Sequence, residues 1–272
     1  MNHYDSYNDP FECWCEVLEG FPKKDSNSSR FRSVIYAWGF DDVNDQAVFE
    51  NYDEYISSLE DAEPSVGAII DNARISCFSK TGDNLLMWSH YGDGLRGFCI
   101  EFDRNLILAN NSNTARIYDV LYRNSPSLID TAVIAVLNDQ VEYHEDAIYA
   151  AEQEIKHFGV DRKEEAEMYK VYLNGVYIKN NEIYQKMLAT KPNEWSYEEE
   201  IRIIYQTTKP EQSGEFFNYP SEAIKSVIFG ERMPDRQVQV LRKLLERHPS
   251  PIILKKASRA KGKFNVIVSN GV

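Results

Sequence analysis

Two segments of the sequence bring together side chains that can move protons or stabilise charge. The first is Met87-Trp-Ser-His-Tyr91, where helical spacing would put His90 at the end of a helix. A histidine in that position can donate or accept a proton near neutral pH. The structural alternative is a buried His90 whose ring nitrogens only satisfy backbone carbonyls.

The second segment, Trp195-Ser-Tyr-Glu-Glu-Glu-Ile-Arg202, carries acidic residues at alternate positions. If residues 198–206 form a strand, Glu198, Glu200 and Arg202 lie on one face, and the arginine offsets the repulsion between the carboxylates. Such a face is either a solvated ion pair that adds little stability or the wall of a cleft with one carboxylate available for chemistry. In the cleft interpretation five side chains converge: His90, Tyr91, Glu198, Glu200 and Arg202.

Two further runs could supply polar groups to the same cleft. The β-type run Ile75-Ser-Cys-Phe-Ser79 supplies Ser76 and Ser79, and the alternating run Gly97-Phe-Cys-Ile-Glu-Phe102 supplies Glu101. The motifs of a serine-hydrolase elbow, a Walker phosphate loop, a dinucleotide-binding turn and a zinc-protease helix are not found in the sequence. None of those enzyme classes is therefore indicated.

The elements that must position these residues are predicted from hydrophobic period and capping residues. Helices are expected from Asn8-Asp9-Pro10 onward, over 45–60, after a cap at Asp83, and over 235–247. Strands are expected over 74–79, 96–103, 117–122, 198–206, 216–219, 224–229, 252–254 and 264–268. Residues 127–190 are expected to form long helices that are interrupted near Gly159.

Strands on both sides of a helical middle predict the α+β class. We expect a single domain over residues 1–272, with a mixed or antiparallel sheet core, flanking helices and a helical insertion at about 127–190. Because helices do not alternate regularly with strands, parallel βαβ winding is not expected.

Composition limits the classes of partner. The chain has 272 residues and a net charge of −13, from 43 acidic and 30 basic residues, so extensive binding to nucleic acid is not expected. The spacing of the four cysteines does not fit a zinc module. No apolar run is long enough for a membrane span, and the polar start does not resemble a secretory signal. We expect a cytoplasmic protein that binds a small molecule or nucleotide.

Charge is unevenly distributed along the chain. The predicted helical insertion is acidic and rich in tyrosine, whereas the last forty residues are mostly basic. The acidic insertion is therefore a candidate surface for a protein partner.

Four of these motifs occur together and in order in a known family. They are Ser6-Tyr-Asn-Asp-Pro-Phe-Glu12, Ile75-Ser-Cys-Phe-Ser79, Met87-Trp-Ser-His-Tyr91 with Gly97-Phe-Cys-Ile-Glu-Phe102, and Trp195-x-Tyr-Glu-x-Glu-x-Arg202. Over nearly its whole length the chain resembles the bacterial domain-of-unknown-function family 2971. Members of that family usually have a strand before the first motif. Only residues 1–5 precede it here, so we expect that strand to be missing, through a wrongly chosen start codon or a shortened variant.

The order of these motifs also resembles that of ADP-ribosyltransferases, by arrangement only. The resemblance implies that Glu200 stabilises an oxocarbenium-like transition state as nicotinamide leaves NAD. Glu198 would orient the substrate, Ser76 or Ser79 would support Glu200, and Tyr91 would stack on a ring. This chemistry needs no metal.

Two other functions remain open from the sequence. One is a metal-dependent hydrolase, in which Glu101, Glu198, Glu200 and His90 bind magnesium or manganese. The other is a non-catalytic module that binds a ligand or a partner. The scattered character of the family also fits a role in phage defence or as a toxin.

Overall fold

The chain folds into two compact units, each formed from segments that are distant in sequence. The structure is a computed structural model that describes residues 1–110 and 114–271, and its helices and strands confirm the α+β class. Unit 1 comprises residues 1–12, 71–124 and 191–272, and unit 2 comprises residues 13–70 and 125–190.

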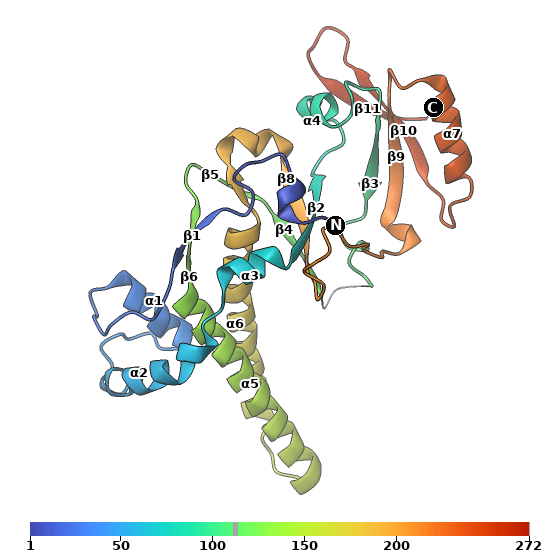
Figure 1. The fold of residues 1–272 in the computed structure, drawn as a ribbon. Coiled ribbons are helices and arrows are strands. Elements are labelled where there is room, and N and C mark those ends of the chain that lie inside the picture. Colours follow the sequence, from blue (N-terminus) through green and yellow to red (C-terminus); the bar gives the residue numbers. More distant parts are fainter. Residues whose placement is uncertain (111–113, 272) are drawn as a thin grey trace. The chain divides into compact units, whose positions relative to one another are not determined.

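One sheet of unit 1 positions the predicted acidic strand. In it, β8 (Glu200–Gln206) lies between β2 (Ala73–Ser79) and β4 (Ala115–Asp119), and both pairings are antiparallel (Figure 1). Cys77 lies opposite Arg202, and Ser79 lies opposite Glu200. Residues paired directly across two strands project to the same side of the sheet. These four side chains therefore share one face.

A second sheet of unit 1 has the strand order β11-β10-β9-β3 within the described residues. Its strands are β3 (Phe98–Phe102), β9 (Ile224–Gly230), β10 (Ile253–Arg259) and β11 (Val266–Asn270). Two helices of this unit are α4 (Leu85–His90) and α7 (Asp235–Leu245). A separate strand pair is formed by β5 (Leu121–Arg123) and β7 (Thr190–Pro192). Short 3-10 turns occupy Tyr4–Ser6, Asn193–Glu198 and Ser221–Ala223.

The connection from β9 through α7 to β10 corrects one sequence expectation. β9 and β10 are parallel neighbours, so this segment is a βαβ unit, although the chain as a whole lacks regular alternation. Gly230, at the end of β9, allows the backbone at Leu95 to pass close by, because an added Cβ there would lie 2.2 Å from the Leu95 carbonyl oxygen. No side chain fits such a close approach of two backbone segments.

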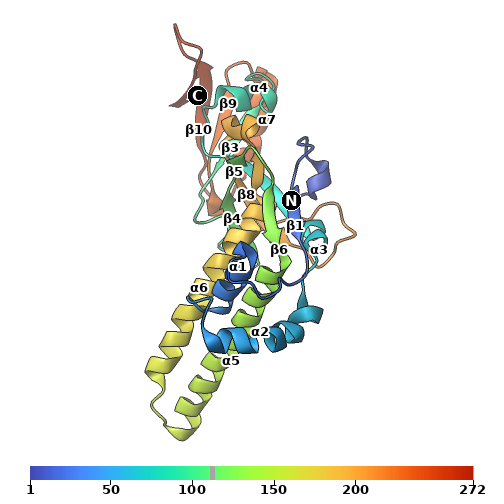
Figure 2. The same ribbon diagram turned by 90° about the vertical axis from the view of Figure 1, so that its left-hand side faces the viewer.

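In unit 2, helices pack beside a parallel strand pair. β1 (Cys15–Leu18) pairs with β6 (Ser127–Asp130). A 3-10 turn lies at Glu60–Ala62. The helices that start within unit 2 are α1 (Ser29–Trp38), α2 (Gln46–Leu59), α3 (Val66–Asp71), α5 (Thr131–Phe158) and α6 (Lys163–Leu188). α5 and α6 form a long hairpin and lie side by side in both views (Figures 1 and 2). Gly159 ends α5 in a left-handed conformation (φ 66°), which confirms the predicted interruption.

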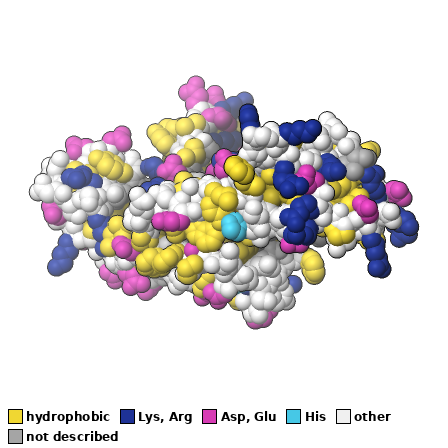
Figure 3. Space-filling view, turned by 90° about the horizontal axis from the view of Figure 1, so that it is seen from above, with side chains coloured by type: hydrophobic (Ala, Val, Ile, Leu, Met, Phe, Trp, Pro, Cys, Tyr) yellow, Lys and Arg dark blue, Asp and Glu magenta, His cyan; other side chains and the backbone are white. Residues whose placement is uncertain are grey.

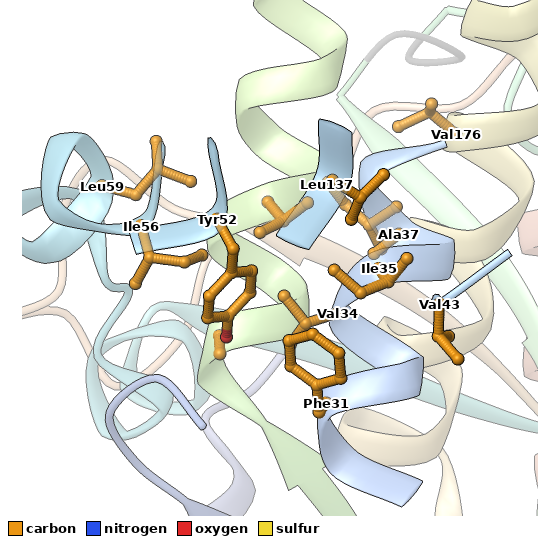
Figure 4. Packing of buried hydrophobic residues seen from close by; sticks show 13 residues of the cluster. Phe31, Val34, Ile35, Ala37, Val43, Tyr52, Ile56, Leu59, Leu137 and Val176 are labelled. Carbon is orange, nitrogen blue, oxygen red and sulfur yellow. The ribbon is translucent and has the colours of Figure 1, made fainter. Parts of the chain in front are cut away.

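The core of unit 2 forms where α1 and α2 pack against α5 (Figure 4). Phe31 is fully buried and meets the Tyr52 ring edge-on, with 4.9 Å between ring centroids. The Tyr52 hydroxyl donates to the carbonyl oxygen of Pro22 at 2.6 Å, so its polar end is satisfied. Asp45 caps α2, as the sequence predicts, by accepting from the amides of Ala47 and Val48.

Several predicted elements are wrong. The helix expected after Pro10 is instead a turn, in which Asp9 accepts from the amide of Phe11, followed by β1. Pairing of β1 with β6, far away in sequence, overrides the local capping signal. The cap of α4 is Asn84 rather than Asp83.

Two predicted strands also differ from the structure. The strand expected over 117–122 is interrupted after β4, at Val120, whose amide donates to the carbonyl of Glu200. Residues 216–219 form no strand, and the Phe216 side chain is fully exposed. An aromatic run without a pairing partner does not form a strand.

We predict that Phe31→Ala lowers the free energy of unfolding by about 3–5 kcal/mol, because it leaves a cavity among α1, α2 and α5. Tyr36→Ala on the same helix is the control, since that side chain is 45% exposed. Urea unfolding measures both variants. Equal stability of the two variants would contradict the packing described for this core.

Candidate functional site

A buried network of alternating charges lies at the start of β8. The Lys191 ammonium donates to Glu198 Oε2 at 2.7 Å and to Glu200 Oε2 at 3.0 Å. The Arg202 Nε donates to Glu200 Oε1 at 2.8 Å, and its Nη1 pairs with the carboxylate of Glu12. Three carboxylates and two cations therefore share one site, with a formal charge of −1. We call these five residues the buried network.

The backbone explains how two glutamates two residues apart can bind one ammonium. Glu198 ends the 3-10 turn Asn193–Glu198, and β8 begins only at Glu200. Between them Glu199 adopts a left-handed conformation (φ 44°), which is uncommon for a side chain of this kind. The predicted strand therefore starts two residues later than expected. Glu198 and Glu200 converge because of this turn rather than because of strand alternation.

Burial and the opposite charges together set the protonation of the network. Glu200 is only 3% exposed. Burial by itself would raise the pKa of its carboxyl, but Arg202 and Lys191 outweigh burial and hold that pKa below its ordinary value. Burial would likewise lower the pKa of Lys191, but Glu200 and Glu198 raise it above the ordinary value. For Glu12 burial prevails, and its pKa is raised despite Arg202.

Aromatic side chains surround the buried network and add hydrogen bonds. The Tyr91 hydroxyl donates to Glu198 Oε1 at 2.7 Å. The Tyr122 hydroxyl oxygen accepts from the Glu200 amide at 2.8 Å. The Lys191 ammonium lies 4.8 Å from the centre of the half-buried Trp195 ring, a cation–π contact. Each carboxylate of Glu198 and Glu200 therefore has two hydrogen-bond partners.

A cleft of about 960 Å³ lies within unit 1. Its apolar lining comes from both sheets and includes Phe78, Ile100, Phe102, Ile117, Ile201 and Ile203. Its charged lining includes Lys80, Arg104, Glu101 and Lys255. Tyr91 also lines it, and this residue is 54% exposed although its hydroxyl reaches the buried Glu198. One phenol thus connects the cleft to the buried network.

The structure brings together four of the predicted cleft residues through one network. Tyr91, Glu198, Glu200 and Arg202 are joined by hydrogen bonds through Lys191. His90 does not join them, since it is exposed at the end of α4, with its ring 5.8 Å from that of Tyr197. The histidine is therefore neither buried, as in the structural alternative, nor part of the network.

The remaining predicted residues are divided between two faces. Ser79 lies opposite Glu200, whereas Ser76 lies opposite Ile203 on the other face of the sheet. Ser79 thus shares the face of Glu200, but its buried hydroxyl makes no hydrogen bond to that carboxylate. Glu101 accepts from Ser226 at 2.6 Å and from Lys255 at 2.5 Å, on the second sheet. It lines the cleft but is not part of the buried network.

Two members of the network were not predicted. No sequence pattern singles out Lys191, which stands beside a proline, and Glu12 lies in a segment where the sequence predicts a helix that does not form. Charge balance is the one signal that points to a further cation, because two glutamates that are buried together need more positive charge than Arg202 alone supplies.

The carboxylates proposed as metal ligands bind different cations in the structure. Glu101 pairs with Lys255, whereas Glu198 and Glu200 pair with Lys191. Across residues 1–110 and 114–271, His, Cys, Asp and Glu side chains form no group of three that could hold a metal ion.

Comparison with known proteins gives a match to one family model. Residues 87–203 match the model described as "Protein of unknown function (DUF2971)", which confirms the predicted resemblance to family 2971 over this part of the chain. The matched region begins in α4 and ends in β8, so it includes Tyr91, Lys191, Glu198, Glu200 and Arg202. No curated protein and no solved structure matches the chain. In the part of the chain that the structure describes, no helix has the length and hydrophobicity that crossing a membrane requires.

We predict that Lys191→Met destabilises the protein by about 3–5 kcal/mol at pH 7, because it leaves two carboxylates buried without their shared cation. The loss should shrink only as the pH falls below about 4.5, the ordinary glutamate value, because the pKa of Glu200 is lowered and the wild-type ion pairs are lost as the pH falls through that lowered value. Urea unfolding between about pH 3 and 7 measures this.

Lys80→Met is the matched control, because Lys80 pairs with Asp119 at 3.1 Å but is about half exposed. It should change stability by no more than about 1 kcal/mol at any pH. A Lys191→Met loss that is equally small, or independent of pH, would mean that the network contributes little to stability.

Proposed function

We propose that this DUF2971-containing protein binds a nucleotide-type small molecule in the cleft of unit 1. The supporting observation is that Tyr91 lines the cleft and also donates to the buried Glu198. A ligand in the cleft would therefore contact a side chain that the buried network holds in place. The volume of the cleft lies at the upper end of the range of small-molecule sites.

The chemistry of the cleft suits a molecule with both a ring and negative charge. Phe78 and Phe102 pack edge-on, with 5.6 Å between their centroids, and supply apolar surface for a planar ring. Lys80, Arg104 and Lys255 line the same cleft and carry positive charge suited to phosphate. Each of these cations also contacts a carboxylate, Asp119 or Glu101. A phosphate would have to compete with those ion pairs.

An ADP-ribosyltransferase-like reaction on NAD remains the enzymatic form of this proposal. The geometry favours a different division of roles from the one expected, because both oxygens of Glu200 bind cations. Glu200 then acts as a positioning residue that orders Lys191 and Arg202. Tyr91 is the group that faces the ligand. Burial raises its pKa to about 12, so at neutral pH the phenol stays protonated and keeps its hydrogen bond to Glu198.

We predict that Lys255→Met weakens the binding of NAD or ADP-ribose by about tenfold or more, because it removes a cation from the cleft wall. Lys256→Met is the control, since successive strand residues face opposite sides and Lys256 does not line the cleft. Isothermal titration calorimetry measures both variants. Unaltered binding by Lys255→Met, or no binding by the wild type to any nucleotide tested, would contradict the proposed site.

Nicotinamide release from NAD tests whether binding leads to a reaction. We predict that Tyr91→Phe lowers the release rate by about tenfold or more, because it removes the donor that links the ligand to Glu198. The change should lower stability by no more than about 3 kcal/mol, which thermal unfolding checks. If wild-type protein binds NAD but releases no nicotinamide, the function is binding without transfer, and depletion of cellular NAD in phage defence or toxicity is ruled out with it.

A further inference from the structure

One end of the second sheet gathers basic side chains from segments that are distant in sequence. The parallel strands β9 and β10 both end there, at Gly230 and Arg259, and the antiparallel strands β3 and β11 begin there. We call residues 93–98, 230–236 and 259–266 the basic end of this sheet. Its basic residues, all exposed, are Arg96, Arg232, Arg236, Arg259, Lys261 and Lys263. Its acidic residues are Asp93, Glu231 and Asp235.

Two of these arginines converge beside Gly94. The Arg232 Nη1 donates to the Gly94 carbonyl oxygen at 3.3 Å, and the Arg96 Nη1 donates to the Asp93 carbonyl oxygen at 3.2 Å. A Cβ built on Gly94 would lie 3.5 Å from Arg96 Nη1 and 3.7 Å from Arg232 Nη1. The Asp93 carboxylate lies 3.8 Å from Arg96 but is 79% exposed, so it offsets the repulsion between the two cations weakly. An anion beside Gly94 would interact with both guanidinium groups.

Ion pairs use only part of the positive charge of the basic end. Arg259 pairs with Glu231, whose carboxylate also accepts from the Arg259 amide at 3.2 Å. The basic residues that form no ion pair within residues 1–110 and 114–271 are Arg232, Arg236, Lys261 and Lys263. The second sheet lies at the right of Figure 1, and Lys and Arg side chains gather on the right-hand side of the view from above in Figure 3. This end is therefore locally positive, although the chain has a net charge of −13.

The tip of the β10–β11 hairpin adds an aromatic ring to this charge. Phe264 is fully exposed and comes directly after Lys263. The hairpin reverses at Gly262, whose left-handed conformation (φ 71°) glycine adopts without steric cost. A phenylalanine ring stabilises a fold by leaving water. One that stays in water at a basic tip is instead suited to a ligand that has both negative charge and flat rings.

We propose that the basic end binds a short single strand of nucleic acid. The phosphates pair with the arginines and lysines, and one unstacked base lies on the Phe264 ring. The surface is confined to one end of one sheet, so it differs from the extensive contact that the net charge of the chain disfavours. The basic residues of this end and Phe264 do not line the cleft of unit 1. This proposal is therefore independent of the ligand proposed for the cleft.

An anionic membrane is the other partner that basic and aromatic side chains suit. The hairpin tip, Ala260-Lys-Gly-Lys-Phe-Asn265, has Phe264 as its one large apolar residue. A single ring buries little apolar surface, whereas stable binding at a membrane surface requires a larger apolar face. A flexible strand can also reach both the hairpin tip and the guanidinium groups at Gly94. These features favour nucleic acid over a membrane.

Fluorescence anisotropy of the full chain with a labelled oligothymidylate of about 12 nucleotides tests the stacking contact. Phe264→Ala should weaken binding by about fivefold or more, because it removes the ring on which a base lies. Phe216→Ala is the matched control, since that ring is equally exposed but follows Glu215, and it should bind like the wild type. An abasic strand of the same length should bind the wild type and Phe264→Ala equally, because it has phosphates but no bases.

Charge reversal tests the phosphate contacts. Lys261→Glu with Lys263→Glu should weaken binding by about tenfold or more and reduce the slope of log affinity against log salt by about 1.4, the value for two phosphate contacts. Lys243→Glu with Arg247→Glu is the control, because it makes the same change in net charge on exposed residues near the C-terminal end of α7. It should bind within about twofold of the wild type. Thermal unfolding verifies that each variant is folded.

A wild type that binds no strand at about 50 mM salt overturns the proposal. Equal losses in the test and control variants overturn it too, because net charge rather than the basic end would then govern binding. Undiminished binding by Phe264→Ala would remove the stacking contact on which the choice of a single strand depends. Binding to vesicles of phosphatidylserine and phosphatidylcholine without binding to the oligonucleotide would overturn the proposal and assign this surface to a membrane.

Discussion

The sharing of one ammonium between two buried carboxylates is the constraint on which unit 1 depends. Lys191 holds Glu198 and Glu200 together against their mutual repulsion, and the backbone follows by turning left-handed at Glu199. Removing such charges from water costs several kcal/mol each, and only close, well-oriented partners offset it. Arg202 supplies the second of those partners and extends the ion pairs to Glu12. A strand start, a turn and an N-terminal segment are thereby fixed by one set of contacts.

Hydrogen bonding in the buried network separates structural from ligand-facing groups. Each oxygen of Glu200 already accepts a hydrogen bond from a cation, so a cationic ligand group would have to compete with Lys191 or Arg202 for this carboxylate. Tyr91 is different, because its ring lines the cleft while its hydroxyl reaches Glu198. Tyr91 and the glutamates therefore have different roles, although a hydrogen bond joins Tyr91 to Glu198.

Sequence patterns predict the elements of this fold better than they predict the contacts between them. The period-two run at 98–102, the cap at Asp45 and the break at Gly159 are local signals, and each confirmed element depends on its own residues. The helix predicted after Pro10 is wrong because β1 forms there by pairing with β6, which is more than a hundred residues away. The same limit applies to the site. Glu200 and Arg202 stand out in their own strand, whereas Lys191 and Glu12 become visible as partners only when the chain is folded.

The two ends of the buried network coincide with places where the chain passes between its units. Glu12 is the last residue of the first segment of unit 1, and Lys191 is the first residue after the helical hairpin segment of unit 2. Residue 13 and residue 190 of unit 2 are each bonded directly to a residue that forms a buried ion pair. Local unfolding at either residue would therefore pull on that ion pair. Detaching Lys191 would leave Glu198 and Glu200 without their shared cation, whereas detaching Glu12 would remove only one of the two carboxylates that pair with Arg202. Through Glu200 and Arg202, one continuous set of ion pairs therefore joins the residues at these two crossings, Glu12 and Lys191.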